Sequence, residues 1–239
     1  MGCIGSIPAA DNFLVPEVTF QASGGGLMPG LGDDASLVLR YESWGPTSIA
    51  EAGCDLPAKT IEVKDSSGVV LFRVSARATG LQHFQEKSWI RNAEGAVIGC
   101  MATCQQQIPG AVDTTSYKLY GARPRVEGVQ PEFSGEGVNM FPWALLTRRP
   151  ASTTATIALA APGGFEAAPT FRQSNRMGPP PQRFTLELAS GGGCVHGDKQ
   201  NGAMKLTLPK GMDPVLAVAS NLMWKFALSE FPADSADSH

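Results

Sequence analysis

Apolar and polar residues alternate in short runs along most of the chain, and turn residues separate the runs. Residues 61–64 alternate, residues 65–68 form an Asp-Ser-Ser-Gly turn and residues 69–75 are mostly apolar, which together predict a β-hairpin. The same pattern recurs over residues 88–101. Short strands at this rhythm predict an all-β barrel or sandwich. Further strands are predicted at residues 36–41, 116–120, 143–147, 153–159, 183–188 and 203–208.

The C-terminal region has a different pattern. Asp213 can cap a helix whose first residue is Pro214, and residues 215–228 are apolar on almost every face. A helix that is apolar all round must be buried on all sides. The run is shorter than a bilayer requires and contains Asn221 and Lys225, so we expect a core helix, with a membrane span as the alternative. An all-β shell followed by such a helix predicts a barrel with the helix through its middle.

The composition is that of a globular chain. Its 239 residues are 43% hydrophobic and 17% charged, which excludes a wholly disordered protein. The net charge of −3 makes nucleic-acid binding unexpected, because dedicated binders are normally basic. The charge is unevenly spread: residues 1–58 hold seven acidic residues and one basic residue, whereas residues 118–210 hold eleven basic and six acidic residues.

Three segments follow from these patterns. Residues 1–35 contain a Gly-Gly-Gly run and several prolines with little periodicity, which predicts a flexible leader. Residues 36–231 contain the predicted strands and the helix, and form the predicted barrel domain. Residues 232–239 are expected to be a disordered tail.

The order of these motifs resembles that of the LURP-one-related domain, a family within the tubby C-terminal-like fold that also includes phospholipid scramblases. Residues 60–74 match the family's hairpin with its Asp-x-x-Gly turn and Phe-Arg-Val ending, and residues 89–97 resemble its second hairpin. Residues 143–149 resemble its central basic strand, and residues 212–226 its Asp-started hydrophobic helix. The resemblance covers about residues 36–231. It implies a closed antiparallel barrel of about twelve strands around the central helix, and no established catalytic residues.

Two inserts depart from the family's pattern. They are rich in Gly and Pro and occupy residues 121–142 and 161–182, and Lys225 is an unusual basic residue late in the helix. The resemblance therefore does not extend to any function that these inserts carry.

The first six residues, Met-Gly-Cys-Ile-Gly-Ser, match the N-myristoylation pattern. Removal of Met1 exposes Gly2 for myristoylation, and Cys3 lies where S-palmitoylation commonly follows. One myristoyl chain holds a protein only reversibly, and a second chain makes the anchor stable. We therefore predict lipidation at Gly2 and Cys3, with a chance match as the alternative.

Basic residues are concentrated in the second half of the predicted barrel. If several converge on one face they could hold a phosphoinositide head group, because Arg pairs bidentately with phosphate. The tubby resemblance points to the same ligand, and the alternative is that these side chains are ordinary solvated residues. The candidate head-group residues are Lys118, Arg123, Arg125, Arg148 and Arg149, with Arg172, Arg176 and Arg183 as further members of the basic set.

Common enzyme motifs are absent from the sequence, and it contains only three histidines. Cys194 and His196 follow three glycines, where a loop is expected rather than a thiol–imidazole site. The five cysteines are expected to be free thiols in a reducing compartment, with Cys100 and Cys104 on or near a strand. We predict no catalytic residue, no metal site and no cofactor.

The function expected from these patterns is that of a non-enzymatic adaptor or regulator, lipid-anchored on the cytoplasmic face of the plasma membrane or an endomembrane. Its expected partners are membrane lipids, including an anionic phospholipid head group, and an unidentified protein. The alternative is a scramblase-like protein that translocates phospholipids. An acidic calcium-loop pattern is missing and the helix is predicted to be buried, and both observations count against that alternative.

Overall fold

The computed structural model describes residues 27–28, 37–42, 59–76, 87–104, 115–149, 152–176, 183–189, 194–200, 203–209 and 212–230. Apart from Leu27 and Met28, the predicted leader lies outside the described residues, and so does the predicted tail over residues 232–239. Gly2 and Cys3 are therefore outside them as well.

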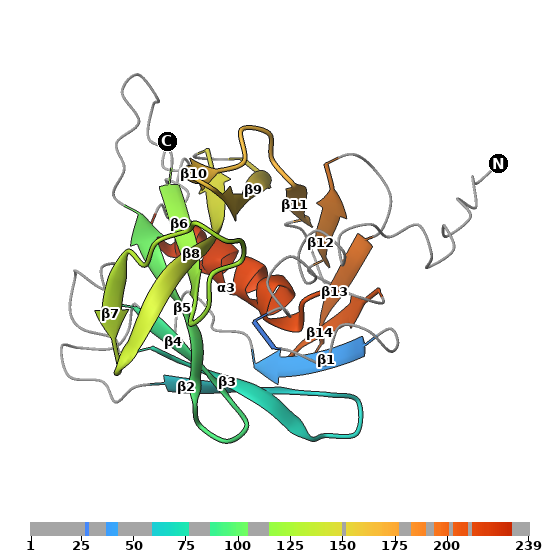
Figure 1. Cartoon of the computed structure of the whole chain (residues 1–239). Helices are drawn as coiled ribbons and strands as arrows, with labels where there is room; N and C mark the ends of the chain where they lie inside the picture. The colour runs from blue at the N-terminus through green and yellow to red at the C-terminus, as the bar shows by residue number, and fades with distance from the viewer. Residues whose placement is uncertain are drawn as a thin grey trace, which may run out of the picture.

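In this part of the chain, twelve antiparallel strands close into a barrel. Figure 1 shows the strands arranged around one helix. The strands are β1 (Leu37–Glu42), β2 (Lys59–Lys64), β3 (Val70–Ala76), β4 (Ser88–Asn92), β5 (Val97–Cys104), β6 (Thr115–Gly121), β8 (Val138–Arg148), β9 (Thr154–Ala161), β11 (Phe171–Arg176), β12 (Arg183–Leu188), β13 (Cys194–Gln200) and β14 (Ala203–Leu208). Two further short strands pair beside the barrel strands: β7 (Phe133–Gly135) pairs with β8, and β10 (Gly164–Phe165) pairs with β9.

The order around the barrel is β9-β11-β12-β13-β14-β1-β2-β3-β4-β5-β6-β8, and the pairing of β8 with β9 closes the ring. Every strand pairing is antiparallel, and β1 joins the two ends of the sequence by pairing with β14. The prediction of a mainly β fold with a closed barrel of about twelve strands is confirmed.

The β2–β3 hairpin illustrates how local sequence produces the strands. Asp65 Oδ1 accepts hydrogen bonds from the backbone N–H groups of Ser67 and Val69, both at 2.9 Å. Gly68 has a φ of 89°, a backbone conformation that glycine adopts without steric cost. The flanking strands then place alternate apolar side chains in the core, and these are Ile61, Val63, Phe72 and Val74.

The helix α3 (Pro214–Glu230) runs through the barrel interior (Figure 1) and lies closest to β6, β8 and β14. Asp213 caps it, because its Oδ1 accepts the N–H groups of Val215 at 2.8 Å and Leu216 at 3.4 Å. Every residue over 215–223 is buried. The predicted central helix is confirmed. Within the described residues, no helical segment combines the length and hydropathy that a membrane span requires.

Two strands were not predicted from the sequence. Residues 194–200 form β13, so the loop predicted around Cys194 and His196 was wrong, and the insert at residues 161–182 contains β11. The reason is weak local patterning, because each strand contributes few apolar residues to the core. The inward positions of β13 include Gly197, where an added Cβ would lie 2.6 Å from Leu206 Cδ2. Close packing with β12 and β14 therefore selects glycine at this position.

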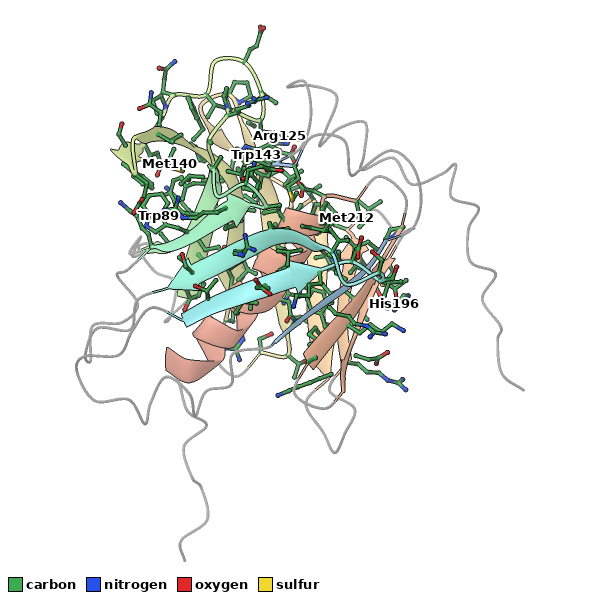
Figure 2. All side chains as sticks on the ribbon, turned by 90° about the horizontal axis from the view of Figure 1, so that it is seen from below. Trp89, Arg125, Met140, Trp143, His196 and Met212 are labelled. Carbon is green, nitrogen blue, oxygen red and sulfur yellow. The ribbon has the colours of Figure 1, made fainter. Side chains whose placement is uncertain are left out.

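A second, smaller core lies outside the barrel wall beneath β7. It consists of Cys100, Tyr120 and Met140, with Trp89 and Phe133 packed against them. Figure 2 shows Trp89 and Met140 together on one side of the molecule, away from His196. Cys100 is a fully buried free thiol on β5, which confirms the prediction of a buried thiol on a strand, and burial raises its pKa to about 12. Cys104 lies in β5, and its side chain is outside the described set.

Candidate anion-binding surface

Arg125, one of the five predicted head-group residues, is buried at one end of the barrel. Its side chain is only 3% exposed and lies beside Trp143 in Figure 2. One guanidinium nitrogen donates to the carbonyl oxygen of Ala160, and another lies 3.5 Å from Glu166 Oε1. Burial lowers the pKa of Arg125, and Glu166 opposes that shift. These contacts tie the segment after β6 to β9 and to the residue that follows β10.

Arg148 is also buried, at the C-terminal end of β8. It lies two positions after the core residue Leu146, and therefore on the same face of the strand, and it is opposite the core residue Ala155 on β9. Its side chain is therefore on the inward side of the barrel wall. The Nε group donates to the carbonyl oxygen of Ser152 at 3.1 Å, and burial lowers the pKa of the guanidinium. This contact links the end of β8 to Ser152, which precedes β9.

Lys118 lies on the outer side of β6, and its ammonium group is bound within the protein. Its Nζ lies 2.8 Å and 3.0 Å from the two carboxylate oxygens of Glu132. Tyr120 donates its hydroxyl to the same carboxylate at 2.8 Å. Glu132 thus joins the strand to the segment that precedes β7.

The remaining two candidates, Arg123 and Arg149, are exposed. Arg123 follows the end of β6, whereas Arg149 follows the end of β8. Because β6 and β8 are antiparallel, with Gly121 opposite Phe141, these two side chains belong to opposite ends of the strand pair. The structure therefore does not gather the five predicted residues on one face.

A different row, of five basic residues and one acidic residue, crosses six neighbouring strands. The row follows the strand register, in which each residue lies directly opposite the next across a strand pair. Such residues share one face of the sheet, and neighbouring strands are about 4.8 Å apart. In order across β2, β1, β14, β13, β12 and β11, the row is Lys64, Arg40, Lys205, Asp198, Arg183 and Arg176. We call these residues the basic row.

The basic row is on the outside of the barrel. Leu39 precedes Arg40 on β1, and Leu206 follows Lys205 on β14. Both leucines are fully buried in the core, so Arg40 and Lys205 face the opposite way. Arg40 and Lys205 are exposed, and the Arg183 side chain keeps 63% of its surface in solvent. For Arg176 the register is described, and the side chain is not.

Two acidic residues pair with members of the basic row, and one of them, Asp198, belongs to the row and lies directly opposite Lys205. Lys64 Nζ lies 3.0 Å from Glu62 Oε2, and Arg183 Nε lies 3.9 Å from Asp198 Oδ1. Among the described residues, neither Arg40 nor Lys205 forms an ion pair. These two cations lie directly opposite each other, an arrangement that is destabilising in a sheet unless an anion lies between them.

A second row, of hydrogen-bonding side chains, runs beside the basic row on β14, β13, β12 and β11. It consists of Thr207, His196, Thr185 and Ser174, which are opposite one another in register. Figure 2 shows His196 at the outside of the β12–β14 wall, away from the helix. Hydroxyl and imidazole groups beside cations are groups that can donate hydrogen bonds to phosphate oxygens.

Cys194 and His196 lie on the same outer face, but they do not make a nucleophilic site. The Sγ atom lies 3.8 Å from His196 Nδ1 and 3.8 Å from Glu187 Oε1. Burial and the nearby Glu187 raise the pKa of the thiol to about 12, so the thiolate is scarce at neutral pH. Across the described segments, no three His, Cys, Asp or Glu side chains come together as metal ligands.

The basic row was invisible in the sequence for a specific reason. Its members come from six strands between positions 40 and 205, each of which contributes one member, and two of those strands were not recognised. Only the register could have revealed it. Comparison of the chain with protein-family models, curated proteins and solved structures finds no match.

Proposed function

We propose that this protein is a non-enzymatic, membrane-associated adaptor whose barrel binds anionic phospholipid head groups through the basic row. The observation that carries the proposal is the direct opposition of Arg40 and Lys205, with Lys64 opposite Arg40 on the other side. Three cations on adjacent strands repel one another in water. A phosphate between them removes that repulsion, so the free protein is already arranged for an anion.

The strength of such a surface is limited. A basic residue close to an anionic membrane contributes about 1 kcal/mol, and salt screens the attraction within a Debye length of about 8 Å. A few cations therefore give weak, reversible attachment. This supports the second part of the proposal, that acyl chains on Gly2 and Cys3 supply the stable anchor while the barrel selects the lipid.

The family assignment is also a proposal. The implied fold of a LURP-one-related domain, a barrel of about twelve strands around a C-terminal hydrophobic helix, agrees with the observed architecture. That agreement supports membership in the tubby C-terminal-like fold. It says nothing about which lipid or protein is bound, because one fold hosts many functions.

Flotation of the unlipidated protein with liposomes tests the head-group proposal. We expect binding to vesicles that contain phosphatidylcholine and a phosphoinositide, weaker binding with phosphatidylserine, and little binding with phosphatidylcholine alone. Arg40→Glu/Lys205→Glu should lower the affinity about tenfold or more, since each cation contributes about 1 kcal/mol. Rising salt should weaken binding of the native protein in the same way.

The matched control is Arg123→Glu/Arg149→Glu, which makes the same change in charge at two exposed sites outside the basic row. This variant should bind nearly as well as the native protein. If it loses binding and the Arg40/Lys205 variant does not, the lipid surface lies elsewhere. Equal binding of the native protein to anionic and neutral vesicles would rule out a head-group site, and lipid transfer between leaflets would favour the scramblase alternative.

A further inference from the structure

Leu27 is docked into one end of the barrel, 186 positions away from its hydrogen-bond partner. Its backbone N–H donates to Asp213 Oδ2 at 3.0 Å, and its side chain belongs to the main hydrophobic core. Asp213 is the residue that caps α3, so a residue of the N-terminal segment is bonded to the start of the central helix. The two carboxylate oxygens have different partners: Oδ1 accepts hydrogen bonds from the first turn of the helix, and Oδ2 accepts one from Leu27.

The site that receives Leu27 is tightly packed. A Cβ added to Gly121, at the end of β6, would collide with both Leu27 and the Trp143 indole ring. Trp143 is fixed in turn, because its Nε1–H donates to the carbonyl oxygen of Arg123 at 2.8 Å. Leu27 therefore fills a defined space between β6, β8 and the helix cap.

Asp213 is an unusual residue to find here, because it is fully buried. Its interactions in the described structure are with the backbone N–H groups of Leu27, Val215 and Leu216. Among the described residues, the charged groups near this end of the barrel are Arg123 and Arg125 after β6 and Glu166 after β10, and the shift in the pKa of Asp213 comes from burial and the three N–H groups. A buried carboxylate that lacks a cation is costly in its ionised form.

We propose that Leu27 and Asp213 form a pH-dependent clasp, which holds the N-terminal segment on the barrel in acid and loosens as Asp213 ionises. Leu27 covers Oδ2 directly, so its departure exposes that oxygen to water. Ionisation favours the hydrated carboxylate and therefore favours the departure of Leu27.

The direction follows from linkage. Burial raises the pKa of Asp213 from its ordinary value of 3.8 to about 6, and this outweighs the three N–H donors, which lower it. When Leu27 leaves, hydration returns the pKa toward its ordinary value. The stabilisation of the docked state is complete below pH 3.8 and is lost as the pH rises through about 6. The docking equilibrium can weaken by up to about a hundredfold across this window.

Hydrogen exchange of the full-length, unlipidated protein tests the clasp. The readout is the protection of the Leu27 and Met28 amides between about pH 4.5 and pH 8, after correction for the intrinsic effect of pH on exchange. We expect protection to fall as the pH rises through about 6, while the amides of β14 stay protected. Protection that is independent of pH, or that increases with pH, would overturn the proposal.

Two variants separate the clasp from general stability. Asp213→Asn keeps an oxygen that can cap the helix but cannot ionise, and its amide nitrogen cannot accept the Leu27 N–H, so protection at Leu27 should be low and should no longer vary with pH. Leu27→Ala leaves Asp213 intact, and should lower protection at every pH while keeping the same titration. If Asp213→Asn does not fold, the native protein and Leu27→Ala still decide the matter. A native profile that Leu27→Ala leaves unchanged would contradict a role for this contact.

Discussion

Gln173 on β11 lies directly opposite Ala155 on β9, with its side chain inside the barrel and fully buried. Neither atom of its amide group has a hydrogen-bond partner in the described structure. Leu186 lies opposite it on the other side. A polar group thus occupies a position whose neighbours are apolar, and desolvation of such a group without a partner costs about 1–3 kcal/mol.

We predict that Gln173→Leu stabilises the protein by about 1 kcal/mol, because it removes the unpaired amide at nearly constant volume. Chemical denaturation measures the change. Arg172, the preceding residue on the same strand, is exposed, so Arg172→Leu serves as a comparison that should give no such gain. Destabilisation by Gln173→Leu would mean that the amide has a partner, such as a buried water.

Gly99 and Gly197 should respond differently to alanine. An added Cβ at Gly99 would lie 2.5 Å from the backbone oxygen of Tyr120, which cannot move without breaking strand pairing. At Gly197 the closest atom is the flexible end of Leu206, at 2.6 Å. We expect Gly99→Ala to cost about 3 kcal/mol and Gly197→Ala about 1–2 kcal/mol, measured as free energies of unfolding. Equal costs would show that the β5–β6 pair can shift.

Arg148 and Arg149 are adjacent in sequence but should tolerate substitution very differently. Arg148→Glu buries a carboxylate beside the carbonyl oxygen of Ser152, and should destabilise the protein by several kcal/mol. Arg149→Glu changes an exposed side chain and should alter stability by less than about 0.5 kcal/mol. Thermal melts of the two variants decide this. Loss of lipid binding in Arg148→Glu would therefore report unfolding rather than a head-group contact.

The central helix should be essential for the fold. Leu222 is fully buried at mid-helix, and Leu222→Asp would place an unpaired carboxylate in the barrel core. The cost of several kcal/mol is a large part of a typical stability of about 5–15 kcal/mol, so we expect unfolded or insoluble protein. Thr207→Asp, on the exposed face of β14, is the matched control and should fold. A truncation after Pro209 that still melted cooperatively would show that the helix is dispensable.

The features that could be predicted from the sequence are those whose causes are local. Asp65 and Gly68 form a turn through contacts within five residues, and Asp213 and Pro214 start a helix in the same way. The helix is apolar on almost every face and must therefore be surrounded by other elements. For this reason a barrel of strands around it could be predicted before the strand order was known.

The orientation of individual side chains could not be predicted in the same way. Arg148 faces inward because the pairing of β6 with β8 has an irregularity between Leu119 and Tyr120. The register of β8 shifts there, and the shifted register continues to the end of the strand. The basic row depends on five strand registers at once. Likewise, nothing near Leu27 in the sequence indicates a bond to Asp213, since that contact exists only after the helix has entered the barrel.

The pairing of β1 with β14 has a consequence for how the chain is made. Leu37 lies opposite Leu208, whereas β1 and β2 share only the pair Arg40 and Lys64. During synthesis, β1 is made some 170 residues before its partner β14, and α3 is made after β14. Contacts of such long sequence separation make folding slow. Until β14 is made, the first strand is unpaired on this side and the core face of the growing sheet is exposed, and surfaces of this kind are prone to aggregation.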